Sequence, residues 1–274
     1  MMKRRRRLSL KLFGSGLGLL AAIWITAPLW HIGKPIPGRY SAPLPATTES
    51  PTPAAATGGR PNPTSADANA ILEHKSAGLE FLRQGQALEA VQEFREALAP
   101  NPNDEDVHFN LGIALSRNGQ LDEAKEHYLE ALRLMPDYTE AHNNLGNLLM
   151  RQGKLDEAID QYQTALKTMP DNATAHNNLG TALARQKRMV EAMAHFREAT
   201  RILPDYSEAH FNLANACLAS GQVIEAITEF NETLRLKPEF APALQGLEQA
   251  RQKMSGIVAR TNSPTSPALA PSRN

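Results

Sequence analysis

The chain has 274 residues, and its 29 Lys and Arg residues balance 29 Asp and Glu residues, so its formal net charge is zero. A neutral chain with only 5% aromatic residues lacks both the positive field and the stacking side chains that nucleic-acid binding requires, and we expect no nucleic-acid partner. The single cysteine, Cys217, excludes a disulfide within the chain.

Residues 1–11 contain a basic cluster, and residues 12–30 form a mostly apolar run. A helix over this run would be about 28 Å long, close to the hydrocarbon core of a bilayer at about 30 Å. We therefore predict a single transmembrane anchor at 12–30. Because basic residues stay on the cytoplasmic side, the N-terminus is expected in the cytoplasm and the rest of the chain on the outer, periplasmic or extracytoplasmic side of the inner membrane.

Signal cleavage is the alternative interpretation of this segment, and it would release an exported soluble protein. The best cleavage position follows Ala27, but Pro28 comes directly after it, which disfavours cleavage. Gly14, Gly18 and Ala22 recur at a spacing of four, a stripe of small residues that would let two anchors approach closely and form a dimer.

Residues 31–68 are rich in Pro, Ala and Thr and show no apolar periodicity. This composition predicts a disordered, semi-rigid linker that holds the next domain away from the bilayer. Residues 255–274 are similar in composition and are predicted to be a disordered tail.

Between these segments, prolines recur every 34 residues, at 102, 136, 170, 204 and 238. A fixed period of this size predicts an array of repeats. The units are 71–104, 105–138, 139–172, 173–206 and 207–240. In the second unit, the recurring residues are Leu111, Gly112, Leu115, Ala124, Tyr128, Ala131 and Pro136.

Small residues at positions 8 and 20 of a unit let two antiparallel helices approach closely, and an aromatic residue at position 24 fills the space beside them. A glycine at position 15 suits the turn between the helices, although Lys187 replaces it in the fourth unit. Residues 241–254 carry one apolar stripe and are predicted to form a capping helix. The whole repeat domain is expected at 69–254.

This pattern resembles the tetratricopeptide repeat (TPR) family. The resemblance implies an all-α, right-handed superhelical solenoid of five hairpins plus the capping helix, with the first helix of each hairpin lining a concave groove that binds protein segments. The helix around His142, Asn143 and Asn144 is similar to those of O-linked N-acetylglucosamine transferase, but no glycosyltransferase domain follows here.

Two rows of polar residues are candidates for the groove. The first consists of asparagines at positions 6 and 9, namely Asn110, Asn144, Asn178, Asn212, Asn147 and Asn215. Amides both donate and accept hydrogen bonds, so such a row suits the backbone of an extended peptide. The second row lies at position 13, with Arg83, Arg117, Arg151 and Arg185, and favours acidic segments.

Some co-chaperones of the family hold an acidic C-terminus with a carboxylate clamp. Lys75 and Asn110 match that clamp, whereas Leu79, Glu140 and Asn144 do not, so this partner class is not expected.

Other residues that suggest chemistry have simpler interpretations. Five histidines recur at position 4, at 74, 108, 142, 176 and 210, but neighbouring repeats are too far apart to share a metal ion. Asp122 with Glu123, and Asp156 with Glu157, are expected at helix starts rather than in catalysis. Cys217 falls at a core position.

The sequence therefore predicts a membrane-anchored scaffold or adaptor that binds extended protein segments, with no enzymatic activity, no cofactor and no metal. The alternative is a substrate-presenting subunit of an envelope enzyme such as a protein glycosyltransferase.

Overall fold

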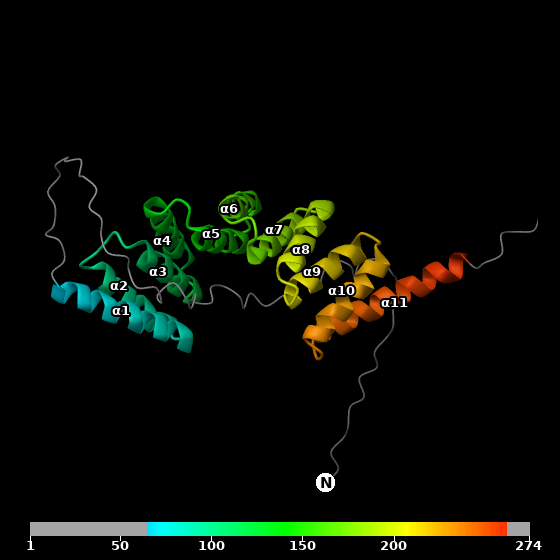
Figure 1. Cartoon of the computed structure of the whole chain (residues 1–274), viewed down its shortest axis with the longest axis horizontal. Helices are drawn as coiled ribbons and strands as arrows, with labels where there is room; N and C mark the ends of the chain where they lie inside the picture. Colours follow the sequence, from blue (N-terminus) through cyan, green and yellow to red (C-terminus); the bar gives the residue numbers. More distant parts are fainter. Residues whose placement is uncertain (1–64, 262–274) are drawn as a thin grey trace, which may run out of the picture. The chain divides into compact units, whose positions relative to one another are not determined.

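The computed structural model of the protein describes residues 65–261 (Figure 1). Within that range the chain forms eleven α-helices and no strand, which confirms the predicted all-α fold. The helices are α1 (Ser65–Gln84), α2 (Ala87–Leu98), α3 (Glu105–Arg117), α4 (Leu121–Leu134), α5 (Thr139–Arg151), α6 (Leu155–Thr168), α7 (Ala173–Arg185), α8 (Met189–Ile202), α9 (Ser207–Ala219), α10 (Val223–Leu236) and α11 (Ala241–Thr261).

The predicted anchor at 12–30 lies outside the described residues, as do most of the predicted linker and most of the predicted tail. None of the helices between residues 65 and 261 is both long and apolar enough to cross a membrane.

Two helices extend into segments that the sequence interpretation left unstructured. Helix α1 begins at Ser65, inside the predicted linker, and α11 continues to Thr261, beyond the predicted end of the capping helix at 254. The physical reason is the position of the prolines, because Pro63 precedes α1 and the next proline after α11 is Pro264. No proline lies between Pro63 and the end of α1, or between Pro242 in the first turn of α11 and Pro264, so neither helix loses a backbone donor in its interior.

The helices pack as hairpins, each odd-numbered helix against the even-numbered helix that follows it, and α11 closes the array against α10. The turn inside each hairpin has a residue with positive φ: Gly85, Gly119, Gly153, Lys187 and Gly221. Lys187 has a φ of 64°, so the fourth hairpin keeps the left-handed turn without its glycine. A residue with a Cβ is strained at positive φ, and the chain keeps the same turn despite this strain.

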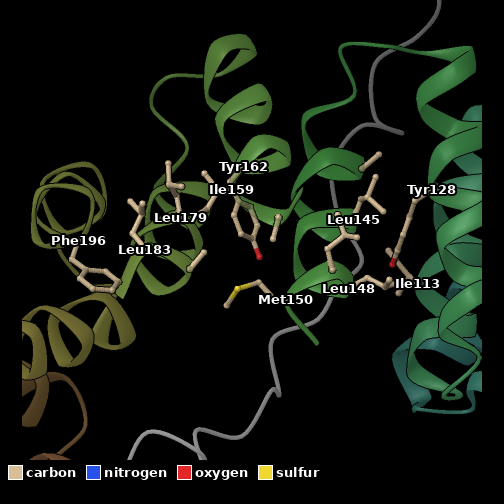
Figure 2. Packing of buried hydrophobic residues seen from close by; sticks show 14 of the residues in the cluster. Ile113, Tyr128, Leu145, Leu148, Met150, Ile159, Tyr162, Leu179, Leu183 and Phe196 are labelled. Atoms are coloured by element: carbon tan, nitrogen blue, oxygen red, sulfur yellow. The ribbon is translucent and has the colours of Figure 1, made fainter. Parts of the chain in front are cut away.

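Inside each of the first four hairpins, the glycine at position 8 lies against the aromatic ring at position 24. A Cβ placed on Gly146 would lie 2.6 Å from Cε1 of Tyr162, and Gly112 and Gly180 stand equally close to their rings. These rings are among the most buried side chains of the core and line up along successive hairpins in Figure 2. Close approach of the two helices therefore depends on a small residue at this position, as the sequence predicted, and in these four hairpins that residue is glycine.

The first helices of successive hairpins also contact one another, in the pairs α1–α3, α3–α5, α5–α7, α7–α9 and α9–α11. The backbones of successive second helices do not approach one another as closely, and these helices meet through side chains, as in the ion pairs Arg95–Glu123 and Arg197–Glu225. The first helices are therefore the more closely spaced side of the stack, which is the side where the candidate groove residues lie.

Candidate functional site

The asparagines at position 6 occupy equivalent places on α3, α5, α7 and α9, and three of them donate hydrogen bonds within the protein. Asn178 Nδ2 donates to Asn143 Oδ1 at 3.0 Å, and Asn212 Nδ2 donates to Asn177 Oδ1 at 2.9 Å. Each of these bonds joins a position-6 amide to the position-5 amide of the preceding repeat. Asn110 instead donates to the carbonyl of Asp106 in its own helix, at 2.8 Å.

Asn144 differs from the other members of the row. Its side chain makes no hydrogen bond to any described residue, and the residue is only 7% exposed. The position-5 residue of the preceding repeat is Phe109, whose ring offers no acceptor. The amide atoms of Asn144 are not among the fully buried polar atoms that lack a partner, so they remain accessible from solvent, and Asn144 is the amide of the row with its full bonding capacity still available.

Both position-9 asparagines use part of their hydrogen-bonding capacity within the protein. Asn147 Oδ1 accepts a hydrogen bond from the Tyr162 hydroxyl at 2.7 Å, and Asn215 Nδ2 donates to the carbonyl of Phe211 at 3.0 Å. Asn147 thus orients a core tyrosine on the second helix of its own hairpin.

The arginines at position 13 connect consecutive repeats. Nη1 of Arg117 donates to the carbonyl of Leu82 at 2.8 Å, Nη1 of Arg151 donates to the carbonyl and hydroxyl of Ser116, and Nη1 of Arg185 approaches the carbonyl of Met150 at 3.4 Å. Each acceptor carbonyl belongs to the last turn of the preceding first helix.

These contacts place a cation at a helix C-terminus, where the helix dipole is negative, and they add a second donor to a carbonyl that already accepts a backbone N–H from the following turn. In the last helix Lys253 takes the same role toward the carbonyl of Leu218, at 3.3 Å. In the fifth unit Ala219 occupies position 13, so the carbonyl of Ala184 receives no such cap. The row therefore has a structural role that the sequence interpretation did not anticipate.

The two cations of the first repeat are held differently. Arg83 forms an ion pair with Glu80 in its own helix, because no repeat precedes it in the described residues. Lys75 Nζ lies 3.0 Å from Asp104 Oδ2, and the same carboxylate accepts a hydrogen bond from the backbone N–H of Val107 and caps α3. Lys75 thus connects α1 to the start of α3.

The position-4 histidines join three segments of the chain. From the second to the fifth unit, Nε2 lies 2.9–3.0 Å from the carbonyl of the proline that ends the preceding unit. In all five units, Nδ1 faces the residue at position 23 of the second helix. That residue is Glu93, His127, Gln161, His195 or Glu229.

The position-23 partner decides the electrostatics of each pair. Burial lowers the pKa of His127, and the neighbouring His108 lowers it further. The pKa of His195 is lowered for the same reasons, with His176 as the neighbour. Burial also disfavours protonated His210, but hydrogen bonds to Glu229 and to the Pro204 carbonyl outweigh it and raise the pKa of His210.

The remaining reactive side chains are in structural positions. Cys217 is fully buried, its Sγ lies 3.9 Å from Sδ of Met193, and burial raises the pKa of the thiol to about 12. Asp122 and Glu123 lie in the first turn of α4, as predicted, and Glu123 forms an ion pair with Arg95. In the described part of the chain, no three His, Cys, Asp or Glu side chains come together as metal ligands.

Sequence reasoning missed the position-5 and position-34 residues between repeats. The ring centroids of Phe109 and Tyr138 lie 4.8 Å apart, those of Phe211 and Phe240 lie 5.1 Å apart, and Asn177 donates to the Tyr206 hydroxyl at 3.3 Å. The recurrence of Tyr or Phe at position 34 was the available signal.

The described residues therefore define a helical-repeat protein whose closely spaced first helices carry a row of amides. Tetratricopeptide-repeat family models match residues 78–119, 117–153, 143–207 and 183–251. The chain belongs to the tetratricopeptide-repeat family.

Solved structures share this fold at low sequence identity. PilF from Pseudomonas aeruginosa is 18% identical, with a TM-score of 0.61 over 73% of this chain and 96% of its own. MamA from Desulfovibrio magneticus RS-1 is 20% identical, with a TM-score of 0.56 over 63% of this chain and 97% of its own. YrrB, described as a TPR protein with an unusual peptide-binding site, is 18% identical, with a TM-score of 0.54 over 67% of this chain and 98% of its own. No curated protein matches the chain by sequence.

Proposed function

We propose that this protein is a membrane-tethered TPR scaffold that binds extended protein segments along its first helices. The observation that carries the proposal is Asn144, a largely buried amide without a hydrogen-bond partner among the described residues, in the middle of a row of amides. A bound peptide backbone would supply both the acceptor and the donor that this side chain lacks.

The neighbouring amides support the same interpretation. Asn178 and Asn212 each use one N–H for a bond between repeats, which leaves the side-chain oxygen and the second N–H for a ligand. The bonds to the preceding repeat also fix the orientation of these amides, so less conformational entropy is lost on binding. YrrB shows that a TPR protein of this fold can carry a peptide-binding site.

Acidic segments are the partner class we favour. Each position-13 guanidinium keeps its charge while it caps a helix, and that charge attracts a carboxylate-bearing segment. Arg117, Arg151 and Arg185 thus place positive charge at regular intervals beside the amide row.

The membrane part of the proposal rests on the sequence. The apolar run at 12–30 and the basic cluster before it support an anchor whose N-terminus faces the cytoplasm, with the repeats on the outer side of the inner membrane. The stripe of small residues in this run supports an anchor-mediated dimer.

We infer that the protein has no catalytic role. Cys217 is buried with a raised pKa, and the carboxylates that open α4 lie at a helix start, where they favour the helix dipole. Neither the fold nor the comparisons favour the alternative of a substrate-presenting subunit for an envelope glycosyltransferase.

The test is affinity capture with the full chain in detergent, followed by identification of the bound proteins. Asn144→Ala removes an amide that makes no bond to the described residues, so partner binding should fall while the melting temperature stays within a degree or so of the wild type. The matched control is Asn143→Ala, which breaks the orienting bond from Asn178 but leaves every position-6 amide in place, and it should weaken partner binding less than Asn144→Ala does. Specific partners that survive Asn144→Ala combined with Asn178→Ala would refute the assignment of this face.

A further inference from the structure

The face of the first helices that carries the amide row also carries charge at both of its edges. Positions 2, 6, 9 and 13 of a unit lie within about 60° of one another around a helix of 3.6 residues per turn, so they share one face. Position 13 holds the arginines. Position 2 holds Asp106, Glu140 and Glu208 in the second, third and fifth units, and Thr174 in the fourth. The face therefore has a basic edge at position 13, amides in the middle and an acidic edge at position 2.

The carboxylates of the acidic edge are only partly used within the protein. Oδ1 of Asp106 accepts a hydrogen bond from the Tyr138 hydroxyl at 2.9 Å. Glu140 and Glu208 are half-buried, and neither forms an ion pair with a described residue. These two glutamates therefore remain available to attract a cation carried by a ligand.

The distance between the two edges fits an extended peptide with its side chains. Eleven residues of helix span about 16 Å, so a peptide backbone lying on the amides is about 8 Å from each edge. Side chains on a helix tilt toward its N-terminus, so the arginines lean over the amides and the position-2 carboxylates lean away from them. A short carboxylate side chain on the ligand thus suits the basic edge, and a longer lysine or arginine suits the acidic edge.

The spacing of the first helices sets the period of a ligand that contacts several repeats. Neighbouring first helices are joined by side-chain hydrogen bonds, such as that from Asn178 to Asn143 at 3.0 Å, and helices packed this closely stand about 8–10 Å apart. A polyproline II segment has three residues per turn and rises about 3.1 Å per residue, so it returns to the same side every 9 Å or so, at about the helix spacing. A β-strand returns to the same side about every 6.7 Å, which does not match that spacing.

From these rows we propose that the first helices bind a polyproline II segment in which acidic, basic and neutral residues repeat with a period of three. This inference rests on the proposed peptide-binding function and specifies its ligand. One edge of the segment faces the arginines and carries Asp or Glu, and a second faces Glu140 and Glu208 and carries Lys or Arg. The third edge points to solvent and suits proline. The backbone between the first two edges lies on the amides, which bond to the carbonyl and N–H groups that polyproline II leaves unpaired.

The acidic edge disfavours a uniformly acidic ligand. A run of carboxylates would pair with the position-13 arginines but would also bring like charge against Glu140 and Glu208, which opposes binding. A segment with both charges is attracted at both edges, and the edge that each charge takes fixes its register. The charge rows therefore select for the order of the ligand's residues as well as for its composition.

The experiment measures the binding of twelve-residue peptides, labelled with a neutral fluorophore, to the full chain in non-ionic detergent at low salt by fluorescence anisotropy. Four repeats of Glu-Lys-Pro and four repeats of Lys-Glu-Pro present the two charge orders, which correspond to the two directions of a peptide on this face. One of them should bind more tightly than a peptide of the same composition arranged in three blocks. Replacing its lysines with serine should weaken binding about fivefold.

Two double variants assign the effect to the acidic edge. Glu140→Gln with Glu208→Gln should make the lysine and serine peptides bind equally, whereas Glu126→Gln with Glu157→Gln removes the same charge from exposed positions on second helices and should keep the preference. A wild type that binds neither repeat peptide more tightly than the block peptide, or a preference for lysine that survives loss of Glu140 and Glu208, would overturn the proposal. Asn144→Ala tests the peptide-binding function separately, because it should weaken all bound peptides by the same factor and leave the preference unchanged.

Discussion

The close approach of Gly146 to Tyr162 makes a sharp test of how the hairpins are built. In Gly146→Ala the new methyl group would lie 2.6 Å from Cε1 of the Tyr162 ring and 2.9 Å from two more ring atoms. Ordinary carbon contacts are about 3.5–4.0 Å, so the ring must move by about 1 Å. It has little freedom to do so, because it is 1% exposed and its hydroxyl donates to Asn147 at 2.7 Å.

The expected penalty combines three effects. Overpacking of a dense core costs about 1–3 kcal/mol, and loss of the tyrosine hydrogen bond costs about 1 kcal/mol. Alanine in place of glycine in a helix returns about 0.5–1 kcal/mol. We therefore expect Gly146→Ala to lower the free energy of unfolding by about 2 kcal/mol.

The assay is urea denaturation followed by far-ultraviolet circular dichroism. The matched control is Gly256→Ala in α11, where a Cβ meets nothing within 4 Å and the substitution should be neutral or stabilise by up to about 0.5 kcal/mol. Tyr162→Leu in the Gly146→Ala background should recover part of the loss by making room. If Gly146→Ala is as stable as Gly256→Ala, the glycine is not required for helix approach and the packing argument fails.

Three further predictions concern single positions. Lys187→Gly should raise the free energy of unfolding by about 1 kcal/mol, measured in the same urea assay, because glycine adopts the φ of 64° without strain; an unchanged midpoint would contradict this. Ala219→Arg should stabilise by about 0.5 kcal/mol by capping the carbonyl of Ala184, and a lower melting temperature would show that the cap does not form. His210→Gln should be destabilising at about pH 6 and much less so at about pH 8.5. The reason is that the raised pKa of His210 adds stability below the unfolded value, and this is lost as the pH rises through the folded pKa; an equal loss at both pH values would exclude the ion pair with Glu229.

The fifth unit shows how far local pattern constrains the core. Ala214 replaces the position-8 glycine there, which by itself predicts a clash with the aromatic ring of Phe230. In the structure Phe230 instead lies against Gly246 of α11, so the space is provided by the next helix. Gly246 is visible in the sequence, but only the packing of α10 on α11 shows that it makes room for the ring of Phe230.

The sequence by itself determined the repeat. A period of 34 residues, small residues at two helix contacts and an aromatic ring between them depend on spacing within one hairpin, and spacing is visible in the printed order of residues. The sequence also showed that the amide, guanidinium and imidazole rows recur at fixed positions of the first helices, because residues at the same position of each unit share a place on the helix.

Only the tertiary structure decided what those rows contact. Three of the four arginines and two of the four position-6 asparagines bond to a residue 35 positions earlier, and the histidines face a residue 19 positions later. Whether Asn144 finds an acceptor, or a histidine meets glutamate, glutamine or a second histidine, depends on the side chain that the neighbouring helix presents. A periodic pattern records that a residue recurs, whereas its role is set by a partner outside the pattern that differs from unit to unit.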